Sequence, residues 1–223
     1  IKLSHVFLVL ALFIASFAQA QSTINVTPVP YEVVQKDGVY HFQGLPKVKY
    51  VTVTNGRMPA ESYRLKVDKK GVTITSTDAA GVFYAHKTLD QLVDGETLPY
   101  CEIYDFPRFP YRGLHVDVSR HFRSVDFLKK QMDAMAMFKM NRMHLHLTDA
   151  AGWRLQIDAY PNLTDHVAWR IGETYHEWEG LGYPFTNAAD PKAYGGFYTK
   201  EDIREIVSYA AERHIDIIPE IEM

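Results

Sequence analysis

The hydrophobic positions of the chain follow two different patterns, which change near residue 105. Between residues 31 and 75, short runs alternate apolar and polar side chains and are separated by Asp-Gly, Asn-Gly and Lys-Gly pairs, which favour turns. These runs are residues 48–54, 63–67 and 71–76. Residues 79–92 then carry apolar side chains at helical spacing. Strands followed by a helix predict a small α+β domain over residues 24–105.

From residue 111 onward, strand-like and helix-like segments alternate. Three apolar runs have the length of strands, and amphipathic segments lie between them. The predicted strands are residues 113–119, 140–147 and 215–222. This order predicts an α/β domain with a parallel sheet over residues 111–223. Residues 100–110 contain two prolines and are predicted to link the two domains.

Both helices predicted in the second domain begin at polar caps. Ser124 is a candidate N-cap residue, and Asp126 lies in the first turn, where it meets the helix dipole favourably. Thr199 and Asp202 form a capping box at the start of the second helix. The predicted buried positions are Leu128, Met132, Met135 and Ala136 in the first helix, and Ile203, Ile206, Val207, Ala210 and Ala211 in the second.

A long connection, residues 148–198, separates the second strand from the second helix. Connections of this length inside a compact domain are uncommon and are usually functional. Trp153, Trp169 and Trp178 lie in it. We expect these rings to pack within the protein rather than to stack on a ligand.

The charge balance of the chain argues against nucleic acid as a partner. The 223 residues carry a net charge of −3 with a pI near 6.4, so there is no basic surface to attract nucleic acid. Cys101 is the only cysteine, which excludes an internal disulfide. We expect it to be a small buried side chain.

Residues 1–20 have the features of a secretory signal peptide. Lys2 supplies positive charge, residues 6–17 are almost wholly apolar, and Ala18-Gln19-Ala20 is typical of a cleavage site. The apolar run is too short to span a bilayer, so it predicts no membrane anchor. We therefore expect an exported protein, either periplasmic or extracellular.

Charged side chains follow the predicted strands at the ends where parallel α/β sheets bind ligands. Arg120 follows the first strand and Asp149 the second. A guanidinium can hydrogen-bond two adjacent hydroxyls, while the carboxylate can accept from the same ligand or hold the arginine. The spacing alone leaves a structural ion pair and a ligand site open. Glu220 and Glu222 alternate at the third strand, where like charges would raise one pKa if both were buried.

Histidines also line the predicted strands. His144 and His146 share one strand face, and Asp149 follows, so the three could hold a divalent metal. His115 and Asp117 share a face of the first strand in the same way. We interpret all of these as structural groups and predict no metal.

Three motifs resemble those of family 20 glycoside hydrolases, the β-N-acetylhexosaminidases. They are SRHF at residues 119–122, HLTD at residues 146–149 and PEIE at residues 219–222. The resemblance implies an α/β protein with a small α+β N-terminal domain, followed by the first part of a (β/α)8 TIM barrel. About three barrel strands are present, so we expect the chain to be the N-terminal portion of a longer protein.

The resemblance also implies an activity and a site. The parent would be an exo-acting enzyme that removes terminal N-acetylglucosamine or N-acetylgalactosamine from glycans, without a cofactor. Arg120 and Asp149 would contact hydroxyls on the non-reducing side of the sugar, and Glu222 would support the active site. The family uses the substrate's own acetamido group as nucleophile. Its Asp-Glu catalytic pair would lie after residue 223, so this chain would hold no catalytic residue.

One departure from the family pattern keeps other hypotheses open. The HLTD motif usually continues with Asp and Gln, whereas this chain has Ala150 and Ala151. That difference favours a non-catalytic carbohydrate-binding protein as an alternative. A metal-dependent barrel hydrolase that uses His144 and His146 is a further alternative.

Overall fold

A computed structural model describes residues 24–222 except residues 55 and 57, so the signal peptide expected at residues 1–20 lies outside the described residues. The chain divides into two compact units between Phe106 and Pro107. Within the described ranges, no helix combines the length and the apolar character needed to cross a membrane.

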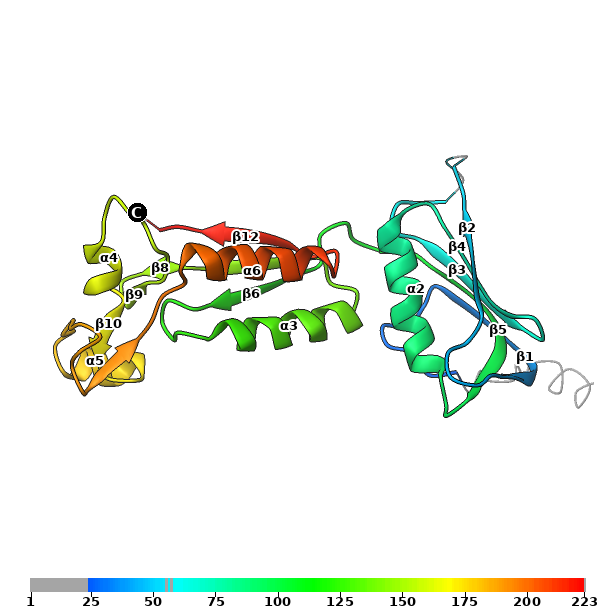
Figure 1. The fold of residues 1–223 in the computed structure, drawn as a ribbon, viewed down its shortest axis with the longest axis horizontal. Helices are drawn as coiled ribbons and strands as arrows, with labels where there is room; N and C mark the ends of the chain where they lie inside the picture. Colours follow the sequence, from blue (N-terminus) through cyan, green and yellow to red (C-terminus); the bar gives the residue numbers. More distant parts are fainter. Residues whose placement is uncertain (1–23, 55, 57, 223) are drawn as a thin grey trace, which may run out of the picture. The chain divides into compact units, whose positions relative to one another are not determined.

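In its described residues, the first unit consists of a five-stranded sheet and helix α2 (Figure 1). Its strands lie in the order β1-β5-β3-β4-β2, and only β2 and β4 pair in parallel. The elements are β1 (Glu32–His41), β2 (Val48–Thr52), β3 (Tyr63–Asp68), β4 (Gly71–Ser76), α2 (Ala79–Leu92) and β5 (Thr97–Asp105). The strands predicted near residues 48–54, 63–67 and 71–76 and the helix predicted over residues 79–92 are therefore present.

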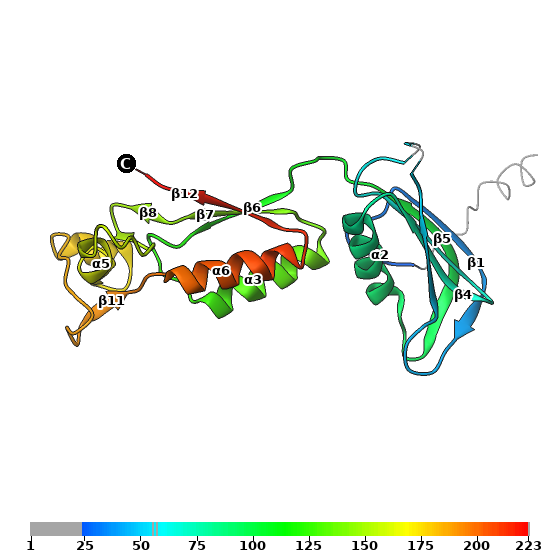
Figure 2. The same cartoon turned by 45° about the horizontal axis from the view of Figure 1, so that its top comes forward.

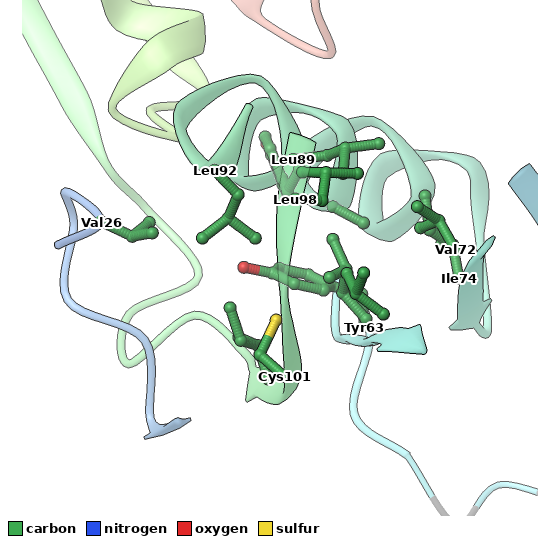
Figure 3. Close-up of a cluster of buried hydrophobic side chains, with 13 residues drawn as sticks. Val26, Tyr63, Val72, Ile74, Leu89, Leu92, Leu98 and Cys101 are labelled. Atoms are coloured by element: carbon green, nitrogen blue, oxygen red, sulfur yellow. The ribbon is translucent and has the colours of Figure 1, made fainter. Parts of the chain in front are cut away.

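Helix α2 covers one face of this sheet. Asp78 caps it by accepting a hydrogen bond from the Gly81 amide at 2.7 Å. Strand β3 alternates buried and exposed side chains, so one of its faces meets the helix. Figure 3 shows Leu89 and Leu92 of the helix directed at this core. The other core residues labelled there are Val26, Tyr63, Val72, Ile74, Leu98 and Cys101.

The predicted linker over residues 100–110 is wrong in its first half. Residues 100–105 belong to β5, which lies between β1 and β3. The alternation in this strand is broken, because Leu98 and Cys101 are both buried although they are three positions apart. Cys101 is fully buried, as predicted, and burial raises the pKa of its thiol to about 11.

The second unit contains a parallel sheet in the order β12-β7-β6. These strands are β6 (Gly113–Asp117), β7 (Arg142–His146) and β12 (Asp216–Glu220), each shorter than predicted. Helices α3 (Val125–Met137) and α6 (Lys200–Ala211) lie on the same side of the sheet (Figure 2). With the α+β unit before it, this open β/α sheet confirms the predicted fold class.

The caps of both helices are as predicted, but the buried stripe of α6 is narrower than predicted. Ser124 caps α3, and Thr199 and Asp202 form a capping box on α6. The four predicted positions of α3 are all buried. In α6, however, Val207 is 48% exposed and Ala211 is exposed as well. Both lie about a quarter-turn away from the line of positions 203, 206 and 210 that meets the sheet and α3.

The long connection forms a subdomain at the carboxyl ends of the strands, beyond the arrowheads in Figure 1. Trp178 is 2% exposed and contacts Tyr183 and Phe185 edge-on, so the expected packing role is confirmed for this ring. The elements are β8 (Thr148–Asp149), β9 (Gly152–Trp153), α4 (Asn162–Asp165), β10 (Trp169–Ile171), α5 (Tyr175–Gly180) and β11 (Ala193–Gly195).

Two leucines of the first unit provide a matched test of its core. Leu98 is 0% exposed and Leu45 is 90% exposed. We expect Leu98→Ala to lower the free energy of unfolding by about 2–5 kcal/mol, because it removes buried contacts and leaves a cavity. Leu45→Ala should change it by less than about 0.5 kcal/mol. Urea denaturation of residues 24–106, monitored by circular dichroism, measures both free energies of unfolding. Equal effects of the two substitutions would contradict the burial of Leu98 in this core.

Candidate functional site

The site is built on one row of residues across the parallel sheet. Asp117 of β6, His146 of β7 and Glu220 of β12 are register partners at the carboxyl ends of their strands. On β7, Met143 and Leu145 are buried in the cluster that includes the helices. Side chains alternate along a strand, so His146 and the rest of its row lie on the opposite face. That face presents the carboxylate and imidazole groups of the row, and the subdomain adjoins the carboxyl ends of the three strands.

Asp117 fixes the start of the segment that carries Arg120. Its Oδ1 accepts hydrogen bonds from the Ser119 amide at 3.0 Å and the Arg120 amide at 2.9 Å. Its Oδ2 accepts from Arg120 Nη1 at 3.0 Å. The predicted structural role of Asp117 thus takes a specific form, because this carboxylate sets both the backbone and the side chain of Arg120.

The structure brings the two predicted site residues together. Arg120 Nη2 lies 2.6 Å from Asp149 Oδ2, while the side chains remain 43% and 23% exposed. The Ala150 amide donates to Asp149 Oδ1 at 2.6 Å. Burial would raise the pKa of Asp149, but Ala150, His146 and Arg120 outweigh it and lower that pKa. The result is an ionised, preformed pair that solvent can still reach.

His146 joins this pair to Glu220. Its Nε2 lies 2.9 Å from Asp149 Oδ2 and 2.8 Å from Arg120 Nη1, and its Nδ1 lies 2.7 Å from Glu220 Oε2. Burial would lower the pKa of this histidine, but the Glu220 and Asp149 carboxylates outweigh it and raise the pKa. Through its two ring nitrogens, His146 therefore connects the Arg120–Asp149 pair with Glu220 of the third strand.

Glu220 is the acidic centre of the row, a role that the sequence did not indicate. Its Oε2 lies 2.9 Å from His144 Nε2 and 3.5 Å from His115 Nε2, in addition to His146. The condition for a pKa rise by repulsion, burial of both Glu220 and Glu222, is not met, because Glu222 is exposed. His146 above all lowers the pKa of Glu220 to about 2. The histidines along the first two strands could have indicated this role in the sequence. They place three imidazoles beside this one strand-end carboxylate.

Glu222 lies just past the end of β12 and reaches the same region. Its amide donates to Thr148 Oγ1 at 2.7 Å, which ties it to the segment of Asp149. An open depression of about 260 Å³ is lined by Thr148, Asp149, Ala150, Trp153, Val167 and Glu222. The three predicted site residues therefore lie at one end of the sheet, and Asp149 and Glu222 share this depression.

One group of side chains offers a possible metal site. In the described part of the chain, His115, His146 and Glu220 present ligand atoms within 4.8 Å of one another. This set differs from the sequence hypothesis, because it replaces His144 and Asp149 with residues of neighbouring strands. Two imidazoles and a carboxylate are suitable zinc ligands. The same atoms make the ion pairs described above.

The sequence analysis did not predict two buried arginines in the subdomain. Arg154 and Arg170 are each 0% exposed and donate hydrogen bonds to backbone carbonyls. Arginines are mostly exposed in proteins, and the sequence around these two gives no sign of burial. Their acceptors come from segments far apart in the chain, so only the folded arrangement identifies them.

Comparison with known proteins assigns both units to one family description. Residues 109–223 match "Glycosyl hydrolase family 20, catalytic domain". Residues 44–106 match "Glycosyl hydrolase family 20, domain 2".

The chain is also similar to individual proteins of that type. It is 45% identical over 174 residues to a beta-hexosaminidase of Porphyromonas gingivalis, which covers 73% of this chain and 20% of that protein. A beta-N-acetylhexosaminidase crystal structure gives a TM-score of 0.75 at 33% identity, over 91% of this chain and 40% of that one. An exo beta-N-acetylglucosaminidase from Vibrio harveyi, in complex with N-acetylglucosamine, gives 0.74 at 30% identity, over 87% and 35%. The chain thus spans a fifth to two fifths of the length of these three proteins.

The ion pairs of His146 predict a specific pH dependence of stability. The raised pKa of His146 stabilises the fold fully below 6.5, its ordinary value, and this contribution is lost as pH rises through the folded pKa. The lowered pKa of Glu220 stabilises the fold above 4.5, and this contribution is lost as pH falls through about 2. Their joint contribution should therefore be greatest between about pH 4.5 and 6.5.

The urea midpoint measured against pH tests this for the wild type and for His146→Asn. The substitution should flatten the profile on both sides of the maximum. His166→Asn is the matched control, because His166 is exposed and its ring makes no ion pair among the described residues. An unchanged profile in His146→Asn would contradict the assigned pKa directions.

Proposed function

The chain belongs to glycosyl hydrolase family 20, and on this premise we propose that its parent protein is an exo-acting β-N-acetylhexosaminidase. The reaction is the removal of a terminal, non-reducing N-acetylhexosamine from a glycan. The observation that carries the proposal is the Arg120–Asp149 pair, which is preformed at the carboxyl end of the sheet and still open to solvent.

The pair has the chemistry to recognise adjacent sugar hydroxyls. The guanidinium of Arg120 donates in a fork, and the ionised carboxylate of Asp149 accepts. Asp117 and His146 hold the two partners before any ligand binds, so little side-chain freedom is lost on binding. This preorganisation supports binding of a sugar at the pair, and the similar exo beta-N-acetylglucosaminidase of Vibrio harveyi supports exo action.

In the proposed reaction, this chain binds and orients the sugar while other residues carry out the bond cleavage. The acetamido oxygen of the substrate attacks its own anomeric carbon while the glycosidic C–O bond breaks and the leaving oxygen takes a proton from the acid. Water then attacks the anomeric carbon of the oxazolinium intermediate and restores the acetamido group, so the two steps together retain the configuration. An Asp-Glu pair beyond residue 223 orients the acetamido group and acts as acid and then base. Glu222, fixed through Thr148 beside the same depression as Asp149, supports that pair from the third strand.

The proposed substrates are glycans that end in N-acetylglucosamine or N-acetylgalactosamine. The similar enzyme from Vibrio harveyi was solved with N-acetylglucosamine, which supports the first of these sugars. Export to the periplasm or the outside, proposed from residues 1–20, would place the enzyme where such glycans are degraded.

A carbohydrate-binding protein without catalysis is a second candidate because of Ala150 and Ala151. Ala150 still donates its amide to Asp149, and Ala151 is 1% exposed. The backbone contacts of this segment do not need the larger polar side chains that the family usually has there. Hydrolysis of an aryl β-N-acetylglucosaminide by the protein expressed from its complete gene separates the two candidates, since a binding protein gives no turnover.

Loss of the Arg120 side chain should impair catalysis by this protein. Arg120→Ala removes charged hydrogen bonds worth about 1.5–3 kcal/mol each. One such bond predicts a fall in kcat/KM of roughly 10- to 150-fold for an aryl β-N-acetylglucosaminide. Arg204→Ala is the control, because Arg204 is a 70% exposed side chain on α6. Equal activity of the two variants would remove Arg120 from the proposed subsite.

Hydrolysis should not depend on a metal ion. His144 and His146 already lie within 3 Å of Glu220 Oε2, so a metal would have to break these ion pairs. The acetamido mechanism also needs no metal-bound water. Activity should therefore survive dialysis against EDTA. Activity that is lost with EDTA and restored by Zn²⁺ would favour a metal-dependent hydrolase instead.

A further inference from the structure

The two buried arginines of the subdomain are held by backbone carbonyls. In the part of the chain that the structure describes, neither Arg154 nor Arg170 forms an ion pair with a carboxylate. A buried charge without such a partner is costly unless hydrogen bonds satisfy it. Burial accordingly lowers the pKa of Arg154 to about 10. Backbone carbonyls satisfy both guanidiniums, and the position of these carbonyls is informative.

Arg154 holds the two residues that precede Arg120. Its Nε donates to the Val118 carbonyl at 3.0 Å, and its Nη2 donates to the Ser119 carbonyl at 2.7 Å. Its Nη1 donates to the Ala168 and Gly196 carbonyls at 2.5 and 3.0 Å. One guanidinium thus ties the end of β6 to two separate loops of the subdomain.

Arg170 holds the next carbonyl in the chain. Its Nη2 donates to the Arg120 carbonyl at 2.9 Å and to the Glu173 carbonyl at 2.7 Å. Its Nη1 reaches the Ala151 carbonyl at 3.3 Å. Together the two arginines therefore fix three consecutive carbonyls, at positions 118, 119 and 120.

The same arrangement reaches the segment that carries Asp149. Asp149 pairs with Gly152 in the β8–β9 hairpin, and the Gly152 carbonyl accepts from Ser119 Oγ at 2.7 Å. The Arg154 amide donates to the Leu147 carbonyl at 3.0 Å. A Cβ on Gly152 would lie 2.4 Å from Arg154 Nη2, so the hairpin must have glycine here for the guanidinium to fit.

We propose that Arg154 and Arg170 are positioning residues for the Arg120–Asp149 subsite. They lock the backbone from Val118 to Arg120 against the β8–β9 hairpin, so that the exposed Arg120 side chain is aimed at Asp149 before a sugar binds. The inference rests on the proposed function of that pair, and it adds to the site two residues that do not touch the substrate.

Lysine cannot replace either arginine in this role. Each guanidinium donates from separate nitrogens in a fixed plane to carbonyls on different segments. A lysine ammonium keeps the charge but has one nitrogen on a flexible stem. Arg154→Lys and Arg170→Lys therefore preserve the charge and remove the fork, which is the change that tests positioning.

A double-mutant cycle separates positioning from general stabilisation. The protein expressed from its complete gene is assayed with an aryl β-N-acetylglucosaminide. We expect Arg154→Lys to lower kcat/KM roughly tenfold or more in the wild-type background, but less than about twofold in the Arg120→Ala background. Arg170→Lys should behave in the same way and serves as the second variant if the first does not fold. Equal factors in both backgrounds would overturn the proposal.

Arg112→Lys is the matched control for loss of a carbonyl-bridging guanidinium. Arg112 lies at the opposite end of β6, where it donates to the Lys139 and Phe109 carbonyls at 2.7 and 2.8 Å. Thermal unfolding of each variant reports the stability effect separately. Arg112→Lys should lower the melting temperature without changing KM or kcat, and a fall in kcat/KM like that of Arg154→Lys would contradict a specific positioning role.

A crystal structure of the Arg154→Lys variant distinguishes failure of this inference from failure of the proposed function. Wild-type protein that does not hydrolyse the aryl substrate would reject the function. The positioning role predicts, with or without turnover, that Arg120 Nη2 leaves its wild-type place 2.6 Å from Asp149 Oδ2. A variant in which this pair is unchanged would overturn the inference.

Discussion

In-register pairing of three parallel strands is the constraint on which the rest of this site depends. It places Asp117, His146 and Glu220 in one row at the carboxyl edge. Side chains alternate between the two faces of a sheet, so a slip of one residue would move these groups into the apolar layer under the helices. The burial of Met143 and Leu145 against the helices opposes that slip. The hydrophobic layer therefore fixes the geometry of the charged one.

The charges of the row are arranged to hold one arginine without burying it. His146 lies between Asp149 and Glu220, and Asp117 and Asp149 flank Arg120. Carboxylates and imidazoles thus balance one another around a guanidinium that remains 43% exposed. Such a surface ion pair contributes little to stability. Its effect is to keep hydrogen-bond donors and an acceptor in a fixed geometry that solvent can still reach.

The subdomain supports this row by a different principle. Arg154 and Arg170 are fully buried, and they are satisfied by carbonyl groups rather than by carboxylates. Carbonyls carry partial charge and lie at fixed places in the backbone, so these bonds determine the path of the chain. The long connection is therefore an ordered structure whose hydrogen bonds are directed at the end of β6.

The sequence by itself determined the local features of this protein. Helix caps, the buried stripe of α3 and the strand alternation follow from neighbouring residues, and the motifs at strand ends located Arg120 and Asp149. Tertiary structure decided the central place of β5, the exposure of Val207 and the low pKa of Glu220. It also decided the burial of the two arginines of the subdomain. These features depend on groups distant in the chain, and a pattern of adjacent residues does not specify which strands, carbonyls or imidazoles will become neighbours.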